Sequence, residues 1–274
     1  MVTTVVKAGG AREPYSREKL LASLTRCGLP EGEALKIVEE VEGGLPAEVT
    51  SDEIYARVLG LLRERAPALG IRYAVRRALM RLGPEGYPFE KYVARLFERM
   101  GYSARTNVVA RGRCVQHELD VVAEGGGRRL FAECKYHNSP GIKVDVKVAL
   151  YVHARYLDLS GQFDEAWIVT NTKVTEEAAA YAECVGIRVL AWRYPAQGLE
   201  ALVERYRLYP ITVLPSLSEE RRRKLLASGV VVLDDLLKLG AEGLRELAGA
   251  DPLEAERVIE EAKLIERLSP LQGC

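Results

Sequence analysis

The sequence lacks the features that would place it in a membrane or outside the cell. None of its apolar runs approaches the roughly 18 residues that a membrane-spanning helix needs, and the opening stretch MVTTVVKAGG has no long apolar core behind a basic segment. The five cysteines are odd in number, widely spaced and never in a CxxC pair, which argues against a disulfide framework and a structural zinc site. We therefore expect a cytoplasmic protein with reduced thiols and no membrane partner.

Net charge is lacking as well. The 39 Lys and Arg residues balance 39 Asp and Glu residues, so that global electrostatics does not favour nucleic-acid binding and any such binding needs local basic faces. With 48% hydrophobic and 28% charged residues the chain is typical of a globular protein. Its 274 residues predict two or three compact units.

Two stretches rich in proline and glycine divide the chain. GPEGYP, at 83–88, follows a helix-rich stretch, and YPITVLP, at 209–215, precedes another. Closely spaced proline and glycine favour turns over packed elements. We therefore predict a multidomain protein with domains at 1–83, 84–208 and 209–274. The two end domains should be helical, and the central domain should be α/β.

The first domain should combine a β-hairpin with helices. TTVVKAGGAREPY holds the tight-turn signal Gly9-Gly10, and sets of apolar residues at spacings of three and four follow it. The residues from Thr50 to Glu53 fit a capping box. The stretch VVKAGGAREPYSREKLLASL resembles the opening of the ATP-cone domain, a regulatory domain that binds ATP or dATP in ribonucleotide reductases and their repressors.

This resemblance covers residues 1 to about 82 and implies a nucleotide effector. The residues that it would place around the nucleotide are Lys7, Arg12, Glu13, Lys19, Tyr73 and Arg76. Cations suit a triphosphate, because Lys and Arg give charge-assisted hydrogen bonds to phosphate oxygens. The family usually has Arg after the first Lys, where this chain has Ala8, so the sequence leaves open whether ATP activates, inhibits or binds. The alternative is that these charges form a solvated face of the hairpin and helix.

The central domain holds a pair of strands with acidic residues. ELDVVAEGGGRRLFAECKY predicts two strands joined by a glycine turn. We expect residue 123 to pair near residue 128. Asp120 then lies diagonal to Glu133 on the same face, within about 7 to 8 Å, so that both carboxylates can converge on one cation. Residues two apart share a strand face, and Lys135 therefore joins them.

Asp120 and the run Glu133-Cys134-Lys135 match the pattern D-x12-E-x-K. This pattern resembles the metal-dependent nucleases of the PD-(D/E)xK superfamily. Mg²⁺ or Mn²⁺ would then be held by Asp120, Glu133 and the carbonyl of Cys134, activating a water and neutralising charge on a phosphate, while Lys135 orients the water. The alternative is that Glu133 and Lys135 are ordinary surface residues, because Glu and Lys often occupy the outward-facing positions of an edge strand.

The order of the surrounding elements favours the nuclease interpretation. PFEKYVARLFERMGY predicts a helix with Glu90 beside its buried stripe, and the strand pair is followed by a helix at 143–157, the strand WIVTN, a helix capped by Thr175 and the strand IRVLAW. This order, over residues 86–195, resembles the catalytic domain of Mrr-like restriction endonucleases, which implies an α/β/α core with a mixed sheet. The active-site residues implied are Glu90, Asp120, Glu133 and Lys135.

Two residues near Asp120 depart from the Mrr-like pattern, which often has a glycine-rich approach to the aspartate. CVQHELD places His117 and Glu118 there instead. Glu118 alternates to the same face as Asp120 and is either an extra ligand or a solvated strand end. His117 is better explained as a structural or surface residue than as a catalytic one.

The last segment, at about 214–268, resembles tandem helix-hairpin-helix domains of recombinases and repair nucleases. In that motif a glycine turn at a helix start offers backbone N–H groups to DNA phosphates. The residues that the resemblance implies for DNA contact are Gly249, Arg221, Arg222, Arg223 and Lys224. The first turn lacks glycine, and Asp251 in the second would repel phosphate unless it simply caps a helix. A protein-docking or dimerising helical domain is the alternative.

The sequence thus predicts a metal-dependent DNA endonuclease that hydrolyses phosphodiester bonds and is regulated by ATP or dATP. A homodimer is expected, because a duplex must be cut twice. A second hypothesis is a nucleotide-responsive DNA-binding regulator with an inactive nuclease fold, and a third is a docking module of a repair assembly. The DNA structure, base preference and oligomeric state are not determined by the sequence.

Overall fold

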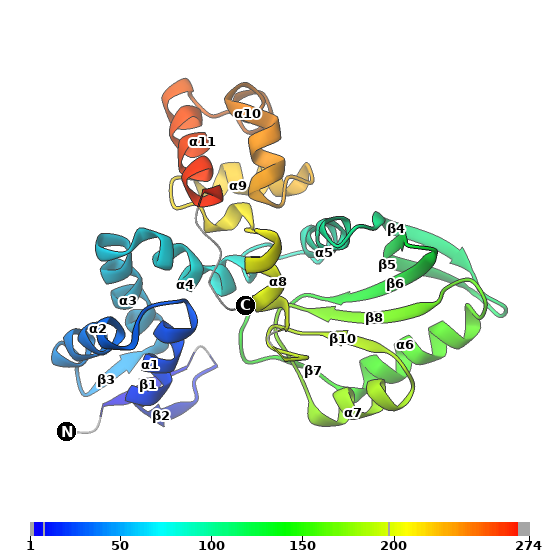
Figure 1. The fold of residues 1–274 in the computed structure, drawn as a ribbon, viewed down its shortest axis with the longest axis horizontal. Helices are drawn as coiled ribbons and strands as arrows, with labels where there is room; N and C mark the ends of the chain where they lie inside the picture. Colours follow the sequence, from blue (N-terminus) through cyan, green and yellow to red (C-terminus); the bar gives the residue numbers. More distant parts are fainter. Residues whose placement is uncertain (1–2, 8, 197, 268–274) are drawn as a thin grey trace. The chain divides into compact units, whose positions relative to one another are not determined.

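The structure, a computed structural model, describes residues 3–7, 9–196 and 198–267. It divides into two compact units, Met1–Val75 and Arg76–Cys274 (Figure 1). The division lies inside helix α4 (Pro67–Leu79). Within the described ranges, every helix is too short or too polar to cross a membrane.

The first unit combines a small sheet with helices. Its strands, in the order β2-β1-β3, are β2 (Arg12–Pro14), β1 (Thr4–Val6) and β3 (Glu48–Thr50). β1 pairs with β2 in the antiparallel sense, which confirms the predicted hairpin, and with β3 in the parallel sense. Its helices are α1 (Arg17–Arg26), α2 (Glu31–Gly43), α3 (Ser51–Arg65) and the first part of α4.

Side-chain caps and apolar stripes explain these helices. Ser16 accepts a hydrogen bond from the backbone N–H of Lys19 at the start of α1. Thr50 and Glu53 form the predicted capping box at the start of α3. The inward faces of the helices meet in a core whose fully buried members are Leu24, Ala34, Val38, Val58 and Leu62.

The second unit is built around a five-stranded mixed sheet in the order β10-β8-β6-β5-β4. Its strands are β4 (Ser103–Arg111), β5 (Gln116–Gly125), β6 (Arg128–Lys135), β8 (Glu165–Thr170) and β10 (Arg188–Leu190). β4, β5 and β6 are antiparallel neighbours, whereas β6, β8 and β10 run parallel. The short strands β7 (Lys143–Val144) and β9 (Lys173–Val174) pair separately.

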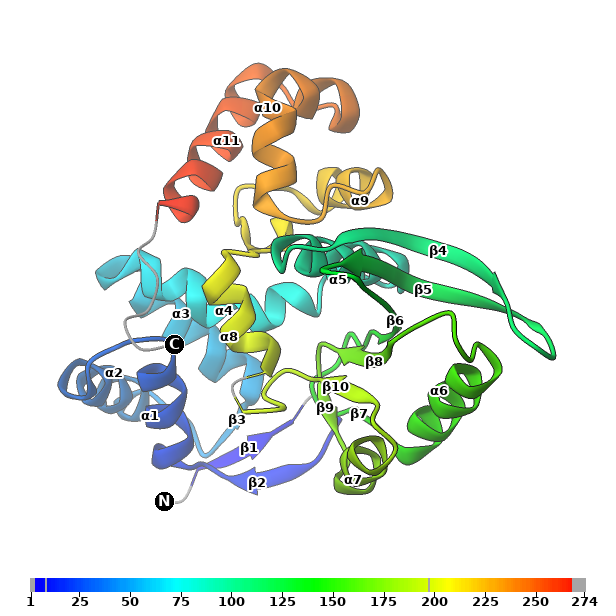
Figure 2. The same cartoon turned by 45° about the vertical axis from the view of Figure 1, so that its right-hand side comes forward.

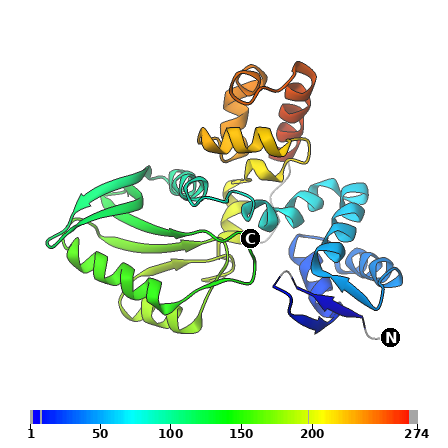
Figure 3. The same ribbon diagram turned by 180° about the vertical axis from the view of Figure 1, so that it is seen from behind.

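Helices cover both faces of this sheet (Figure 1, Figure 3). They are α5 (Tyr87–Arg99) on one face, and α6 (Val146–Asp158) with α7 (Glu176–Cys184) on the other. Phe131 of β6 packs in one buried cluster with Val152 of α6 and Ala182 of α7. Phe97 of α5 instead meets the ring of Trp167 in β8 edge-on, with centroids 5.5 Å apart. This arrangement is consistent with the predicted restriction-endonuclease-like core.

The hairpin of β5 and β6 turns more tightly than predicted. Gly126 and Gly127 both have positive φ, 59° and 74°, and Gly125 pairs directly with Arg128. A two-residue turn with positive φ at both positions matches the twist of the flanking strands. Only glycine adopts this conformation without steric cost.

The tight turn changes the pairing of the two strands. Ala123 pairs with Leu130, so the predicted pairing near residue 128 is wrong. The register runs as far as the pair Val121 and Ala132, and one further step brings Asp120 level with Glu133. The acidic residues are therefore directly opposite rather than diagonal.

The rest of the second unit is helical. After the sheet come α8 (Gly198–Tyr206), the short 3₁₀ helix η1 (Ile211–Val213), α9 (Glu219–Ala227), α10 (Leu233–Ala248) and α11 (Pro252–Glu266). Gly240 interrupts α10 with a φ of 70°. The C-terminal segment is therefore helical, as the sequence predicts.

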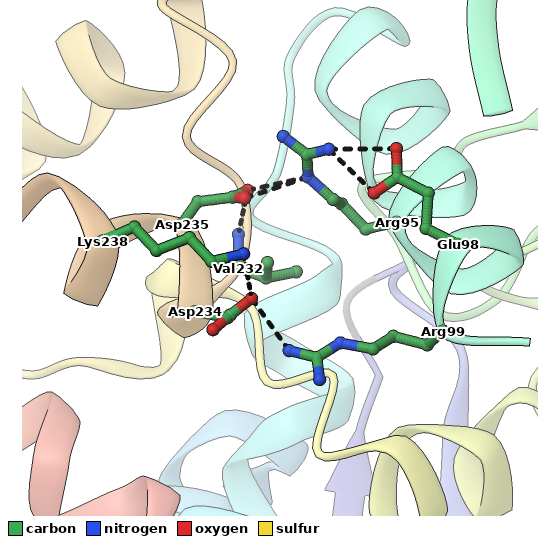
Figure 4. Close-up of a pocket in the computed structure, with 7 residues that line it drawn as sticks. All are labelled: Arg95, Glu98, Arg99, Val232, Asp234, Asp235 and Lys238. Atoms are coloured by element: carbon green, nitrogen blue, oxygen red, sulfur yellow. Dashed lines mark hydrogen bonds and ion pairs between the residues drawn. The ribbon is translucent and has the colours of Figure 1, made fainter. Parts of the chain in front are cut away.

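These helices are attached to α5 by a buried hydrogen bond and by ion pairs. Tyr92, which is fully buried, donates its hydroxyl to the carbonyl of Leu208 at 2.7 Å. Arg95 and Arg99 meet the first turn of α10, where Arg95 pairs with Asp235 at 2.9 Å (Figure 4). Arg99 pairs with the neighbouring Asp234, also at 2.9 Å. A polar cavity of about 320 Å³ lies among these charged side chains.

Candidate active site

The strand pair β5–β6 brings three of the predicted site residues together. One carboxylate oxygen of Asp120 accepts the backbone N–H of Cys134 at 2.6 Å. Lys135 donates its ammonium group to Glu133 at 2.7 Å. The paired part of β5 and β6 ends at Val121 and Ala132, and the side chain of Asp120 then bonds to the backbone of β6 beside Glu133.

Glu133 is almost fully buried, with 5% of its surface exposed, and each of its oxygens faces a cation. Lys135 holds one oxygen, and Arg155 of α6 holds the other at 2.5 Å. Arg155 is 7% exposed, donates a second hydrogen bond to the hydroxyl of Tyr151 and stacks its guanidinium on that ring at 4.5 Å. A buried carboxylate needs such pairing, since an uncompensated charge in the interior is very costly.

Sequence reasoning missed Arg155. A signal for it exists, because Arg155 continues the inward stripe of Ala149 and Val152 at a spacing of three. An arginine on an apolar stripe is seldom fully buried unless it has a partner. The sequence pattern does not indicate that Glu133 is that partner, since the two residues lie on different elements.

Glu90 of α5 completes the acidic cluster. Burial, and then the negative charges of Asp120, Glu118 and Glu133, raise the pKa of Glu90 to about 7. Its second carboxylate oxygen is buried and finds no hydrogen-bond partner among the described residues. Burial and the neighbouring Glu133 raise the pKa of Asp120 to about 6. Glu90 and Asp120 therefore hold their protons to a higher pH than free carboxyl groups do.

The cluster fits a hard divalent cation in its donor chemistry. Carboxylate and carbonyl oxygens are the ligands that Mg²⁺ and Mn²⁺ prefer. A site that binds a cation should have unpartnered carboxylate oxygens and raised carboxyl pKa values when the cation is absent. Glu90 has such an oxygen, and Asp120 has such a pKa. Across the described ranges, however, no three His, Cys, Asp or Glu side chains are already arranged to hold an ion. Lys135 and Arg155 pair with the two oxygens of Glu133.

The two residues that precede Asp120 have different surroundings. His117 pairs through its Nε2 with Asp158 of α6 at 2.8 Å and takes no part in the acidic cluster. Glu118 is exposed, and its charge contributes to the raised pKa of Glu90. A structural role therefore accounts for His117, whereas Glu118 borders the site.

The first unit brings part of the predicted nucleotide set together. Glu13 lies between Lys7, at 2.8 Å, and Lys19, at 3.1 Å. Arg12 pairs instead with Glu48 of β3 at 3.2 Å. Of the two remaining members, Tyr73 stacks on Tyr55 of α3 with ring centroids 5.3 Å apart, and Arg76 begins the second unit. Ala8 lies outside the described residues.

The predicted DNA-contact residues of the C-terminal segment differ in their burial and in their partners. Gly249 ends α10 with a φ of 72°, and Arg221 donates to its carbonyl and pairs with Glu254 at 2.8 Å. Arg222 is 4% exposed and donates to the carbonyl of Leu217, so its guanidinium group has little surface available for DNA contact.

Two other basic residues of this segment, Arg223 and Lys224, are exposed. Asp251 accepts the N–H of Glu254 and caps α11, which is the simpler of its two predicted roles.

Known proteins resemble most of the second unit. A family model described as restriction endonuclease matches residues 83–194, and one described as AF1548-like, C-terminal, matches residues 209–266. The chain is 45% identical over 175 residues to an uncharacterized protein of Archaeoglobus fulgidus, which covers 63% of this chain and 99% of that protein. The crystal structure of AF1548, a protein of unknown function, is similar with a TM-score of 0.58 and 44% identity, over 66% of this chain and 99% of that one.

These matches confirm the predicted Mrr-like domain, whereas the ATP-cone and helix-hairpin-helix resemblances stay predictions. A restriction endonuclease domain that holds the acidic cluster suggests a nuclease with a DNA substrate. The chain belongs to the family of the Archaeoglobus fulgidus protein, with a restriction endonuclease domain of the PD-(D/E)xK type at residues 83–194 and an AF1548-like C-terminal domain after it.

Proposed function

We propose that this protein is a DNA endonuclease that hydrolyses phosphodiester bonds with Mg²⁺ or Mn²⁺. The observation that carries the proposal is the meeting of Glu90, Asp120 and Glu133 beside Lys135, with the pKa of two of the carboxyl groups raised by burial and by one another. Carboxyl groups that hold protons near neutral pH can exchange those protons for a cation, and perturbed pKa values of this kind are typical of functional sites.

Each residue has a role in this proposal. Asp120, Glu133 and the carbonyl of Cys134 would hold the ion, with Glu90 close enough to join them. When bound, the ion would supply Lewis-acid activation of water and neutralise charge on the phosphate. Lys135, freed from Glu133 by the ion, would hold the attacking water in line and share the charge that develops on the phosphate oxygens. Arg155 would keep the second oxygen of Glu133 fixed throughout.

Plasmid cleavage tests this proposal. Supercoiled plasmid is incubated with Mg²⁺ or Mn²⁺ and the wild-type chain, Asp120→Asn or Lys135→Ala, with Arg188→Met as a matched surface control. The wild type and the control should nick the plasmid, and the two site variants should be slower by about 100-fold or more, as for loss of one charge-stabilising group. Equal nicking by all four proteins, or nicking by none, would contradict the proposal.

A second candidate is a DNA-binding regulator with an inactive nuclease fold. It is favoured by one observation, that Lys135 and Arg155 already satisfy both oxygens of Glu133. Titration calorimetry with Mn²⁺ separates the two candidates. The endonuclease should bind Mn²⁺ and lose that binding in Asp120→Asn, whereas the regulator should give no heat that depends on Asp120.

We further propose that nucleotide binding by the first unit regulates the nuclease. Lys7 and Lys19 supply cations for a triphosphate, and they would exchange Glu13 for phosphate oxygens. The coupling between nucleotide and DNA would be about 1 to 3 kcal/mol. Calorimetry with ATP and dATP should detect binding that Lys7→Ala and Lys19→Ala both weaken. An unchanged heat in these variants would remove the nucleotide part of the proposal.

Two further elements of the proposal concern assembly and the C-terminal helices. A homodimer would provide the two active sites that a double-strand cut needs, and light scattering with and without duplex DNA would detect it. DNA contact by the C-terminal helices would use the exposed Arg223 and Lys224, because Arg222 is buried and Arg221 pairs with Glu254. Lys224 would exchange its ion pair with Glu220 for a phosphate. Arg223→Ala with Lys224→Ala should then weaken duplex binding without changing Mn²⁺ binding.

A further inference from the structure

The β4–β5 hairpin extends as a long two-stranded ribbon at one edge of the main sheet (Figure 2). Its end carries the sequence Arg111-Gly112-Arg113, which we call the Arg-Gly-Arg tip. The tip belongs to the same strand pair that carries Asp120, but it lies away from the acidic cluster. Asp120 comes four residues after Gln116, the first residue of β5, which is about 14 Å along a strand at about 3.4 Å per residue.

Asp158, at the end of α6, holds the tip in one shape. Its carboxylate accepts the backbone N–H groups of Cys114 at 2.8 Å and Val115 at 3.2 Å, and the side chain of His117 at 2.8 Å. Its own carbonyl accepts the N–H of Arg113 at 2.8 Å. Hydrogen bonds from Cys114 and His117 keep the pKa of Asp158 well below its usual range, so the carboxylate stays charged.

Gly112 is required for this contact. A Cβ atom at Gly112 would come within 2.1 Å of the carboxylate oxygen of Asp158 and 3.0 Å of the carbonyl of Val115. The missing side chain lets the carboxylate reach the backbone of the turn. Arg111 and Arg113, on either side of it, are both exposed. The turn is therefore ordered by backbone contacts and leaves its two guanidinium groups at the surface.

These guanidinium groups differ from other arginines of the sheet. Arg128 and Arg188 both pair with Glu165, at 2.9 and 3.0 Å. Within the part of the chain that the structure describes, neither Arg111 nor Arg113 makes an ion pair.

Two acidic residues lie close to the tip in the fold. Asp158 faces inward with its charge on backbone N–H groups, and Glu118 opposes Val109 further along the ribbon. The tip is therefore a small basic surface on a protein whose net charge is zero.

We propose that the Arg-Gly-Arg tip binds the phosphate backbone of duplex DNA beside the cleavage site. The proposal rests on the nuclease function proposed above and names a contact element for it. A two-stranded ribbon fits the major groove of B-DNA. Arginine suits phosphate because its planar donors match two oxygens at once. The separation along β5 corresponds to about four base pairs at about 3.4 Å each.

Binding of a fluorescent duplex, measured by anisotropy in EDTA, tests this inference apart from cleavage. Affinity is measured from about 50 to 200 mM salt for the wild type and for Arg111→Gln/Arg113→Gln. Two lost phosphate contacts should weaken binding by about tenfold or more at the lower salt and make the slope of log K against log salt shallower by about 1.8. Arg128→Gln/Arg188→Gln, which removes two paired arginines, is the matched control and should retain affinity and slope.

A second variant separates charge from geometry. Arg111→Lys/Arg113→Lys keeps both charges and should retain the wild-type salt slope, because counterion release depends on charge. Thermal unfolding of each variant confirms that it is folded.

The outcomes distinguish this inference from the proposed function. If the wild type cuts plasmid and the glutamine double variant binds duplex with unchanged affinity and slope, the tip does not contact DNA and the endonuclease proposal stands. If the double variant loses affinity for single-stranded RNA but not for duplex DNA, the inference is also overturned. If the wild type neither binds nor cuts DNA, both proposals fail together.

Discussion

At the scale of single residues, the site is governed by the cost of burying charge. Glu133 lies in the interior between two cations, and only one of them, Lys135, belongs to the sequence motif. Arg155 is the other, and it is itself held by Tyr151. A buried carboxylate that loses a partner keeps its desolvation cost and loses the attraction that offsets it. The free energy of unfolding should therefore be sensitive to Arg155.

Arg155→Met should lower the free energy of unfolding of the second unit by about 3 to 5 kcal/mol, as for a broken buried ion pair. Urea unfolding measures this change. Arg188→Met is the control, because Arg188 pairs with Glu165 while 56% of its side chain is exposed, and the loss there should be less than about 1 kcal/mol. Equal losses in the two variants would show that the Glu133–Arg155 pair contributes no more than a surface pair.

Two carboxyl groups of the site should also make stability depend on pH. The folded state raises the pKa of Glu90 from 4.5 to about 7 and that of Asp120 from 3.8 to about 6. Between about pH 4 and 7 the folded chain therefore holds protons that the unfolded chain has released. The contribution of these groups to the free energy of unfolding is fully present below pH 4 and is lost as the pH rises through 6 and 7.

Glu90→Gln replaces one of these two titrating carboxyl groups with an amide that does not titrate. Without metal and with a chelator present, the wild type should lose stability relative to Glu90→Gln as the pH rises from about 4 to 7, because the unfolded wild type releases the Glu90 proton in this range while the folded wild type retains it. Denaturant unfolding at several pH values follows the difference between the two proteins. A difference that stays constant, or one that grows in favour of the wild type, would contradict the raised pKa of Glu90.

At the scale of elements, the two-residue turn between β5 and β6 decides which residues face each other. Gly126 and Gly127 both adopt positive φ, so that the strands pair from the first residue on either side. A turn two residues longer would have left Asp120 diagonal to Glu133. The geometry of the acidic pair is therefore set by the backbone conformation of two glycines that are remote from it in the hairpin.

Gly127→Ala should destabilise the second unit by about 1 to 2 kcal/mol, since an L-residue with a φ near 74° clashes with its own backbone. Gly60→Ala is the control of opposite sign. Gly60 lies within α3, where an added Cβ meets nothing within 4 Å, so alanine should stabilise the helix by up to about 1 kcal/mol. Thermal unfolding shows both shifts. A Gly127→Ala protein as stable as the wild type would mean that the turn tolerates another conformation.

At the scale of the whole molecule, the chain consists of two compact units with their own cores. Leu62 is fully buried in the core of the first unit and Phe131 in that of the second. The C-terminal helices, in contrast, share the second unit with the restriction endonuclease domain, to which Tyr92, Arg95 and Arg99 attach them. We therefore expect two levels of stability rather than three.

Core truncations should affect one unit at a time. Leu62→Ala should lower the stability of the first unit by about 2 to 5 kcal/mol, and Phe131→Ala that of the second by about 3 to 5 kcal/mol, through lost burial and the cavity left behind. Amide hydrogen exchange measures the stability of each unit separately within the intact chain. If Leu62→Ala lowered the protection of β5 and β6 as much as that of α3, the two units would unfold as one.

Much of the site could be predicted from the sequence, because local rules place its residues. The period of two puts Glu133 and Lys135 on one strand face, and the helical stripe brings Glu90 to the border of the core. The glycines of the turn predict a hairpin, although the length of the turn was predicted incorrectly. Positive φ at both central glycines would have given the correct register, since glycine pairs favour two-residue turns.

What the sequence by itself determined is the identity and spacing of the charged groups, because the periods of strand and helix follow from backbone geometry alone. Only the tertiary structure decided their partners. Arg155 reaches Glu133 from another element, Asp158 of α6 holds the backbone of the turn at Cys114, and Arg222 is buried whereas Arg223 and Lys224 are exposed. Such pairings depend on which elements pack together, and burial then fixes the charge state and the energy of each group.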